Sequence, residues 1–340
     1  MNNPHLPGII VTGVGHHLPK YSEDNETLCR NLDVTPQWIL EKTGIEQRFI
    51  AGPEEYASQF ATIAAQRAIE MAGISVEQVD LIIACTFSGD YLYPPLSAKV
   101  QMDLKAINAQ IFDLQANCTG FVTGLTVASD RMRVDHSVRN ALVIGVEFLS
   151  RYIDRSDVNT AIYLSDGAGA AVLSRIDDPA YGIKSSAFHT DSSNYESVRM
   201  RGGGSKHPFI GRVFDPSVDY MEMNGIATWK QAITHLPRVI RKACEKSGVA
   251  PADVDFLLLH QANLRMIEYI VRKMGYRMEQ TYTNVARVGN TGSASVAIAL
   301  SEAVQNNLIN DGDVLVLAAV GAGFNFGASI WRWKMPTKDA

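Results

Sequence analysis

Apolar, β-branched runs alternate with amphipathic stretches along most of the chain. This alternation predicts an α/β fold with buried strands. A helix is expected over 56–73, where apolar residues recur at helical spacing and Gly73 ends the segment. Strands are expected at 8–15, 80–85, 109–114, 140–146 and 169–174. The pattern fails between Ala187 and Tyr220, where the polar, glycine-rich segment 191–212 predicts a long loop, either a functional lid or a plain connector.

The second half of the sequence repeats parts of the first. AIEMAGISVEQVDLII at 68–83 matches ACEKSGVAPADVDFLL at 243–258 with a constant offset of 175 residues. Two looser matches follow in the same order, 140–145 with 313–318 and 167–173 with 325–331. Three matches in one order at nearly one offset indicate two similar α/β halves that pack together.

We therefore divide the chain into an N-terminal half at 1–180, a connecting loop or lid at 181–220, and a C-terminal half at 221–340. In open α/β sheets, ligands bind at the carboxyl ends of strands. The residues at strand-to-helix turns are consequently the candidates for function.

Cys118 lies at such a turn, between the strand at 109–114 and a helix of small and apolar residues. The positive end of that helix is expected to favour the thiolate, and its N–H groups to hold an oxyanion. The alternative is an inert buried cysteine. His260 follows the apolar run 256–259 in the second half, beside the polar Gln261. Its alternative is a hydrogen-bonded core histidine.

Asn290 precedes another helix of small residues, where the ordinary use of asparagine is a helix cap or tight turn. In the last turn, Gly321 and Gly323 flank Ala322 and would let backbone N–H groups approach a ligand. A β-turn is the plain alternative. A cysteine, a histidine and an asparagine at such turns can support thioester chemistry without a metal or a redox cofactor.

Seven segments resemble the β-ketoacyl-[acyl carrier protein] synthase III family of the thiolase superfamily. They are GVGHHLPKYSEDNETL, TPQWILEKTGIEQR, DLQANCTGF, SDGAGAAVL, HQANLRMI, RVGNTGSAS and GAGFNFGAS. They extend from about Gly8 to Trp333 and thin out only in the loop at 187–220. The resemblance implies a thiolase-like fold, in which two duplicated α/β halves form a five-layer αβαβα architecture with a buried central helix after Cys118.

The resemblance also implies an acyltransferase mechanism. Cys118 would take an acyl group from acyl-CoA or an acyl carrier protein, and the backbone N–H groups of Cys118 and Ala322 would form the oxyanion hole. A malonyl thioester on acyl carrier protein or CoA would then lose CO₂. His260 and Asn290 would donate hydrogen bonds to the enolate, whose carbon attacks the acyl-cysteine. The product is a β-ketoacyl thioester, in fatty-acid initiation or a specialised secondary-metabolite pathway.

Binding roles are implied for further positions. Those matched to substrate or CoA binding are Trp38 beside the adenine, Lys42 near the phosphates, Trp229 at the tunnel mouth, and Asn263 and Arg265 along the pantetheine. Tyr93 would line the acyl pocket across a homodimer interface. The cations matched to carrier-protein docking are Lys230, Arg265, Arg272 and Lys273. A core aromatic remains the alternative for Trp38, and a solvated charged face for the cations.

Departures from the family leave alternatives open. Val158 stands where the family has an arginine that touches CoA, so the donor is a carrier protein or CoA is held differently. The 191–212 loop is longer than in housekeeping enzymes, which favours a specialised relative. Acyl transfer to an alcohol or amine without decarboxylation is the main alternative, although Asn290 favours condensation. A non-catalytic partner subunit is a second, although such partners typically lack the nucleophile that Cys118 provides.

Related reaction classes fit less well. Thiolases need a second cysteine in the last glycine-rich turn, and none follows Cys244. Some relatives use a glutamate base near the pocket, but the corresponding loop of this chain offers only Asp90 as an acidic residue. Plant-type polyketide synthases share the three catalytic residue types but not the HQANLR context.

Composition is consistent with the predicted condensing enzyme and excludes several other classes of protein. The chain has 340 residues, 46% hydrophobic and 20% charged, which is typical of globular proteins. A net charge of −5 gives no reason to expect nucleic acid as a partner. The apolar runs are too short for a membrane span, and residues 1–18 lack a signal-peptide pattern. Four cysteines without a C-x-x-C pair suit the reducing cytoplasm, and we expect neither a metal nor a resident cofactor.

Overall fold

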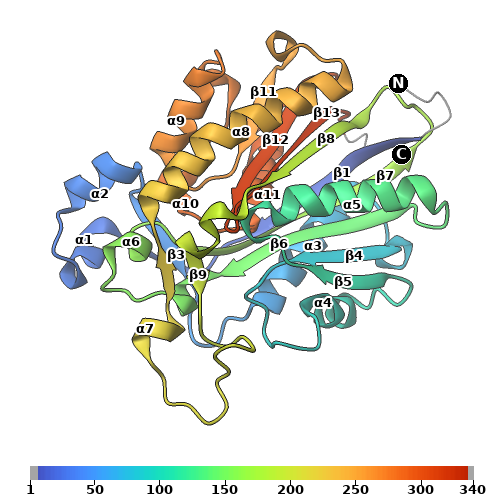
Figure 1. Ribbon diagram of the computed structural model, residues 1–340. Coiled ribbons are helices and arrows are strands. Elements are labelled where there is room, and N and C mark those ends of the chain that lie inside the picture. The colour runs from blue at the N-terminus through green and yellow to red at the C-terminus, as the bar shows by residue number, and fades with distance from the viewer. Residues whose placement is uncertain (1–6, 336–340) are drawn as a thin grey trace.

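The computed structural model describes residues 7–335, and nine strands of this part form one mixed sheet in the order β11-β12-β13-β8-β1-β7-β6-β4-β5 (Figure 1). The strands of the first half are β1 (Gly8–His17), β4 (Leu81–Cys85), β5 (Gln110–Leu114), β6 (Asn140–Phe148) and β7 (Asp166–Ile176). Those of the second half are β8 (Gly182–Thr190), β11 (Phe256–Leu259), β12 (Val314–Gly321) and β13 (Asn325–Arg332). Within the sheet, the two halves are joined at one strand pair, β1 with β8, through Ile9 and Gly182.

The two halves have the same topology. If the five strands of the first half are numbered 1 to 5 along the chain, their order across the sheet from its edge is 3-2-4-5-1. Only the pairs β6–β7 and β1–β7 are antiparallel. In the second half, β11, β12, β13 and β8 correspond to strands 2, 4, 5 and 1 of the first half, in the same order across the sheet. Their parallel and antiparallel pairings also match those of the first half. A single parallel bridge between Leu257 and Thr281 takes the position of strand 3. The predicted duplication is therefore confirmed.

The repeated residues have repeated structural roles. Gly73 ends the helix α3 (Ala57–Ala72) with φ 67°, and Gly248 ends α8 (Gly225–Ser247) with φ 72°, a conformation that favours glycine. The carboxylate of Asp80 accepts a hydrogen bond from Asn140 N at 3.0 Å, at the start of β6. The carboxylate of Asp255 accepts one from Val314 N at 2.8 Å, at the start of β12. The same acid thus fixes the same strand in each half.

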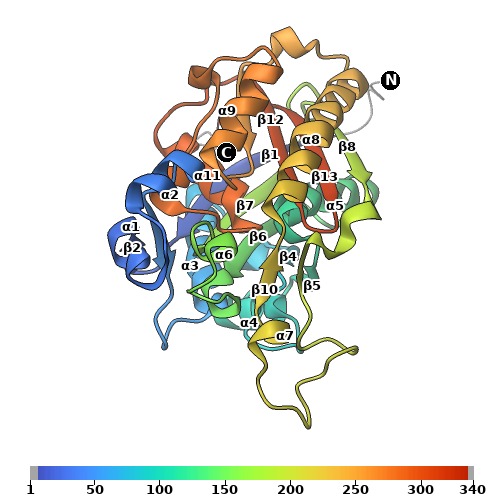
Figure 2. The same cartoon turned by 60° about the vertical axis from the view of Figure 1, so that its left-hand side comes forward.

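The helices complete five layers. Helices α3 and α4 (Leu96–Leu104) cover the outer face of the first half, and α8 and α9 (Leu264–Lys273) cover that of the second. Helices α5 (Gly120–Val134) and α11 (Ala294–Gln305) contact strands of both halves and lie between them. Figures 1 and 2 show α8 and α9 at one side of the molecule and α4 at the other. The helix after Cys118 is central, as predicted.

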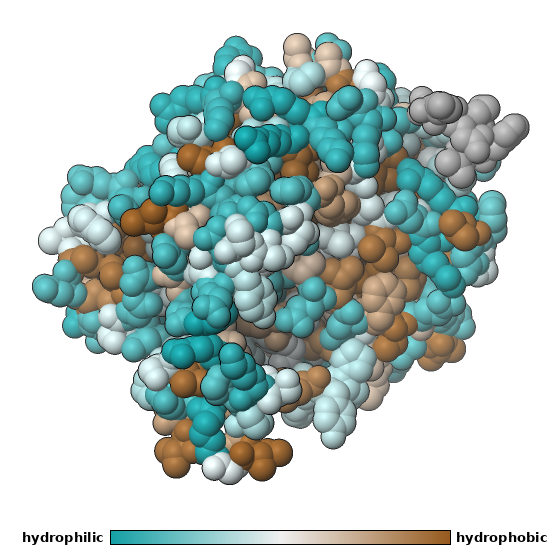
Figure 3. Space-filling model, viewed as in Figure 1, coloured by the Kyte–Doolittle hydropathy of each residue, from teal (hydrophilic) through white to brown (hydrophobic). Residues whose placement is uncertain are grey.

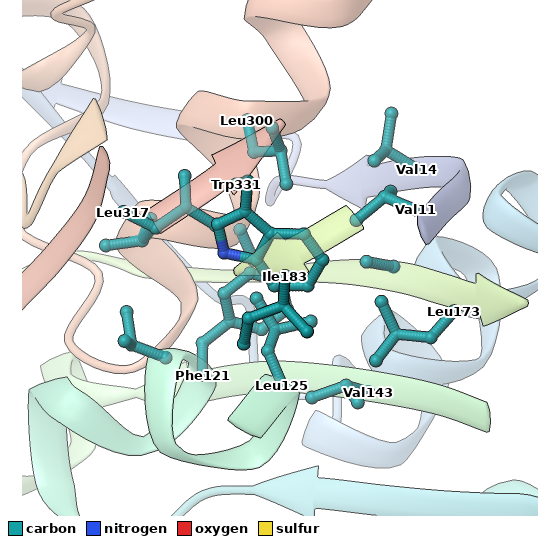
Figure 4. Packing of buried hydrophobic residues seen from close by; sticks show 14 of the residues in the cluster. Val11, Val14, Phe121, Leu125, Val143, Leu173, Ile183, Leu300, Leu317 and Trp331 are labelled. Atoms are coloured by element: carbon teal, nitrogen blue, oxygen red, sulfur yellow. The ribbon is translucent and has the colours of Figure 1, made fainter. Parts of the chain in front are cut away.

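Residues from both halves fill the middle layer, with the Trp331 side chain at their centre (Figure 4). Phe121 and Leu125 reach this cluster from α5, and Leu300 from α11. All four side chains are essentially inaccessible to solvent. Since burying one such side chain stabilises the fold by about 1.5–3 kcal/mol, this shared core joins the halves into one unit.

Shorter elements surround this framework. They are β2 (Tyr21–Asp24), α1 (Asn25–Leu28), α2 (Pro36–Thr43), β3 (Gln47–Ile50), α6 (Val158–Ala161), β9 (Val198–Met200), α7 (Pro216–Asp219), β10 (Met221–Met223) and α10 (Val285–Val288). The short 3₁₀ helices are η1 (Cys29–Asn31), η2 (Val76–Gln78), η3 (Asn117–Thr119), η4 (Leu149–Tyr152), η5 (Ser192–Ser197), η6 (Pro251–Asp253) and η7 (Met278–Gln280). No helix within 7–335 has the length and apolar character needed to cross a membrane.

The predicted loop at 181–220 needs a correction. Its first part is β8, the first strand of the second half, which pairs with β13 along its length. The remainder is irregular apart from η5, α7 and the small β9–β10 pair, so the predicted long loop at 191–212 is largely confirmed. The loop protrudes from the body, and hydrophobic residues gather at its end (Figure 3), where Ile210 and Val213 are exposed.

Candidate active site

One cavity of about 1690 Å³ contains the predicted catalytic residues. Cys118 comes from η3 after β5, His260 from the turn after β11, and Asn290 from the turn before α11. Ala322, in the turn between β12 and β13, lines the same space. Four turns that are far apart in the sequence thus line one cavity.

The Cys118 turn is fastened to the Ala322 turn. Asn117 has a positive φ of 50°, and its side-chain Nδ2 donates a hydrogen bond to Ala322 O at 3.1 Å. Asn325 Nδ2 donates to Thr119 Oγ1, also at 3.1 Å. Gly321 approaches so closely that a Cβ there would lie 3.1 Å from Cys118 N. These contacts hold the peptide groups of Cys118 and Ala322 beside one another.

A Gly321→Ala substitution is expected to disturb this arrangement. The added methyl group would lie 2.9 Å from Ala116 O and 3.1 Å from Thr119 N, so the two turns must separate. We expect acylation of Cys118 to slow by about 10²-fold, the usual effect of losing one oxyanion donor. Single-turnover acylation monitored by mass spectrometry measures this rate.

Gly52→Ala is the matched control, because a Cβ at Gly52 would make only an ordinary contact at 3.5 Å with Glu55. If Gly321→Ala acylates as fast as the wild type and as Gly52→Ala, the close packing of the two turns has no role in acyl loading.

The structure corrects the expected pKa of Cys118. Helix α5 was expected to favour the thiolate, but burial and the nearby Glu147 carboxylate raise the pKa of Cys118 to about 12. The reason is that desolvation disfavours the charged form more than the backbone hydrogen bond at Cys118 favours it. The thiol of the free protein is therefore protonated at neutral pH.

His260 is neutral over the same range. Its side chain is buried, and burial lowers its pKa to about 4. Its Nδ1 lies 2.6 Å from Ser295 Oγ on α11, and its backbone N donates to Ala318 O at 2.8 Å. A neutral imidazole fixed through Nδ1 presents its other ring nitrogen as the available hydrogen-bonding atom.

Asn290 is oriented by its own turn. Gly292 N donates to Asn290 Oδ1 at 3.0 Å, while the Asn290 peptide is held by Tyr163 O and Ser165 N at 2.9 Å each. Because the side-chain oxygen is already engaged, the Nδ2 group is the part of the amide left to act as a donor.

The predicted entrance residues divide into two groups. Seven of the positions singled out from the sequence line the cavity: Trp38, Lys42, Tyr93, Trp229, Lys230, Asn263 and Arg265. Val158, the departure from the family pattern, lines it as well. Arg272 and Lys273 do not. Arg272 forms an ion pair with Glu268 at 3.7 Å, and Lys273 Nζ donates to Ile233 O at 2.9 Å.

Two of the lining residues serve the fold at the same time. Asn263 caps α9, since its Oδ1 accepts from Arg265 N at 2.8 Å. The guanidinium of Arg265 donates to Leu40 O at 3.1 Å and to Glu41 O at 3.0 Å, which ties α9 to α2.

Three residues of the site were missed from the sequence: Asn117, Ser295 and Glu147. The signal for Glu147 was present, because it is the one charged residue in the buried strand NALVIGVEF. Asn117 and Ser295 gave no such signal, since asparagine and serine are common beside helix starts.

Fold and site together define a condensing enzyme of the thiolase superfamily. Family models agree with this class: residues 112–192 match 3-oxoacyl-[acyl-carrier-protein] synthase III, and residues 244–333 match the C-terminal part of the same family. A β-ketoacyl-[acyl-carrier-protein] synthase III from Caldanaerobacter subterraneus subsp. tengcongensis is 36% identical over 323 residues, which cover 95% of this chain and 97% of the relative. One from Erythrobacter litoralis is 36% identical over 325 residues, covering 95% and 98%.

Solved structures give the same result. The 3-oxoacyl-[acyl-carrier-protein] synthase III of Aquifex aeolicus VF5 superposes with a TM-score of 0.88 at 33% identity, covering 96% of this chain and all of the other. The priming β-ketosynthase of the R1128 polyketide pathway gives 0.91 at 31% identity, covering 99% of each. The chain belongs to the β-ketoacyl-[acyl-carrier-protein] synthase III family. It is an acyltransferase that condenses an acyl thioester with a malonyl thioester in fatty-acid or polyketide initiation.

Proposed function

We propose that Cys118 carries the acyl group and that the backbone N–H groups of Cys118 and Ala322 form the oxyanion hole. The observation that carries this proposal is the meeting of Cys118, His260 and Asn290 in one cavity. Cys118 Sγ attacks the thioester carbonyl, the donor thiol leaves, and the thiol proton passes to it. The two N–H groups stabilise the oxyanion that forms in between.

Decarboxylation follows at the other two residues. The Asn290 Nδ2 group and the His260 Nε2–H donate hydrogen bonds to the thioester oxygen of the malonyl group as it becomes an enolate. The C–C bond to CO₂ breaks, and the enolate carbon displaces the Cys118 thiolate from the acyl group. This role requires a hydrogen on His260 Nε2, which a hydrogen bond from the Ser295 hydroxyl to Nδ1 would secure.

The donor is proposed to be an acyl carrier protein or acyl-CoA, and the extender a malonyl thioester on acyl carrier protein or CoA. Trp38, Lys42, Trp229, Asn263 and Arg265 would hold the pantetheine arm at the entrance. Val158 at this entrance offers no charge to a CoA phosphate. Among the proposed carrier-docking residues, Lys230 lies at the cavity itself, whereas Arg272 and Lys273 lie outside it.

A homodimer would complete the cavity. Tyr91, Leu92 and Tyr93 line it although they are 76%, 86% and 85% exposed. Exposed aromatic and aliphatic side chains next to a substrate cavity suit a protein interface, and Tyr93 would then line the partner's acyl pocket. We place the protein in the cytoplasm, a proposal supported by four free cysteines.

Intact-mass spectrometry tests this function. The protein is incubated with matched acyl-CoA and acyl-carrier-protein donors of several chain lengths, and the adduct is mapped to a peptide. We expect a stoichiometric acyl adduct on the Cys118 peptide with at least one donor. The absence of an adduct with every donor, or an adduct on a different residue, would refute the proposed nucleophile.

A further inference from the structure

Glu147 is a carboxyl group in the wall of the catalytic cavity that the chemistry above does not use. It lies on β6, is fully buried and lines the same cavity as Cys118. Its Oε2 accepts hydrogen bonds from the hydroxyls of Ser88 and Thr86, while Oε1 is buried without a partner. No cation among residues 7–335 forms an ion pair with it. A buried acid with one free oxygen and no counterion calls for a physical reason.

The side chain of Glu147 supports the turn that holds Asn290. Gly292 in this turn has a φ of 56°, and a Cβ there would lie 2.9 Å from Glu147 Cγ. The N–H of Gly292 is the donor that fixes Asn290 Oδ1. The methylene groups of Glu147 therefore back the peptide that aims the Asn290 amide.

The carboxyl group of Glu147 also acts on two neighbouring thiols and one phenol. Burial raises the pKa of Cys118 in η3, Cys85 in β4 and Tyr152 in η4, and a charge on Glu147 raises each of these pKa values further. Asp113 on β5 adds to the effect on Cys85, and Arg151 opposes that on Tyr152.

Burial raises the pKa of Glu147 itself to about 7, although its hydroxyl partners oppose this. The Glu147 carboxyl is therefore neutral below that pH and negative above it. The negative form disfavours a second negative charge at Cys118.

We propose that Glu147 is a positioning residue of the condensation site, whose bulk aims Asn290 and whose ionisation opposes the Cys118 thiolate. Its methylene groups keep the turn in place in either protonation state. The neutral form also leaves the nucleophile free of a neighbouring charge. The proposal rests on the functions proposed for Cys118 and Asn290.

The charge effect is tested by the pH profile of Cys118 alkylation with iodoacetamide, followed by mass spectrometry of the Cys118 peptide. Glu147→Gln keeps the size of the side chain but cannot ionise. We expect it to react about threefold or more faster than the wild type at pH 9 and at the same rate at pH 6. Superposable profiles of the two proteins would overturn this part of the proposal.

Asp166→Asn is the control for this profile. Asp166 is a second buried carboxyl on the neighbouring strand β7, but it accepts hydrogen bonds from Ala51 N at 2.7 Å and Ser150 N at 2.8 Å and does not line the cavity. Its variant is expected to follow the wild-type profile. An equal acceleration by Asp166→Asn would show a general effect of buried charge and contradict a specific role of Glu147.

The packing effect is tested by CO₂ release from a malonyl thioester on enzyme that already carries the acyl group. Glu147→Ala leaves space behind Gly292, and we expect release to fall about tenfold or more, whereas Glu147→Gln should restore most of it. Release by Glu147→Ala at the wild-type rate, or equal losses in both variants, would overturn the positioning role. Failure of the wild type to load acyl groups or release CO₂ would instead refute the proposed function.

Discussion

A Cys118→Ala variant takes up no acyl group and loses condensation by at least about 10³-fold. This is the largest effect we expect, because the variant lacks the sulfur that forms the thioester and no other group can replace it. Cys118 is half-buried at the cavity wall, and loss of its Sγ removes little packing, so the thermal unfolding midpoint should hardly change. Intact-mass spectrometry with the preferred donor, together with a product assay, measures both quantities.

Cys29→Ala is the matched control, since Cys29 is also free and half-buried but lies in η1, away from the cavity. It should load and condense like the wild type. If Cys118→Ala still forms the adduct in full, the nucleophile is another residue and the mechanism proposed for the cavity is wrong.

Asn290→Ala and His260→Ala separate the two half-reactions. Both variants should still load the acyl group, because neither side chain belongs to the proposed oxyanion hole. Each should release CO₂ from a malonyl thioester about 10²–10³-fold more slowly, the usual loss when one donor to a developing oxyanion is removed. Loading is followed by mass spectrometry and decarboxylation by trapping labelled CO₂.

The pH dependence distinguishes a neutral histidine from a charged one. Since burial lowers the pKa of His260 to about 4, the imidazole stays neutral from pH 8 down to pH 6. Its contribution to CO₂ release should be constant over this range. His136→Ala, on an exposed histidine away from the cavity, is the control. Normal CO₂ release by His260→Ala would remove the enolate role from this residue.

The duplicated fold could be predicted because the repeated residues have the same structural role in each half. Asp80 and Asp255 each fix the next strand of the sheet, and Gly73 and Gly248 each end a helix. Each role requires one residue type at one position, so it leaves a recognisable pattern in both halves of the sequence. Strand β8 was missed because its sequence, GIKSSAFHT, is half polar, and its pairing with β13 bridges about 140 residues of chain.

The sequence could predict which candidate catalytic residues share the cavity, but it could not predict their electrostatics. The helix after Cys118 was visible, whereas the burial that raises the pKa of the thiol depends on segments packed around η3 from both halves. For the same reason the sequence could not separate Lys230, which lines the cavity, from Lys273, whose ammonium binds a carbonyl of α8. Periodicity identifies an element, and tertiary packing decides which side chains reach the site.

The central claim is that Cys118, His260 and Asn290 form one site for decarboxylative condensation. The most direct measurement loads Cys118 with an acyl group, removes the donor, adds a malonyl thioester and follows adduct, CO₂ and product together. We expect the adduct to disappear as one CO₂ and one β-ketoacyl thioester, two carbons longer than the acyl group, appear per site. Loss of the adduct to an added alcohol or amine, or to water, without release of CO₂ would contradict the central claim.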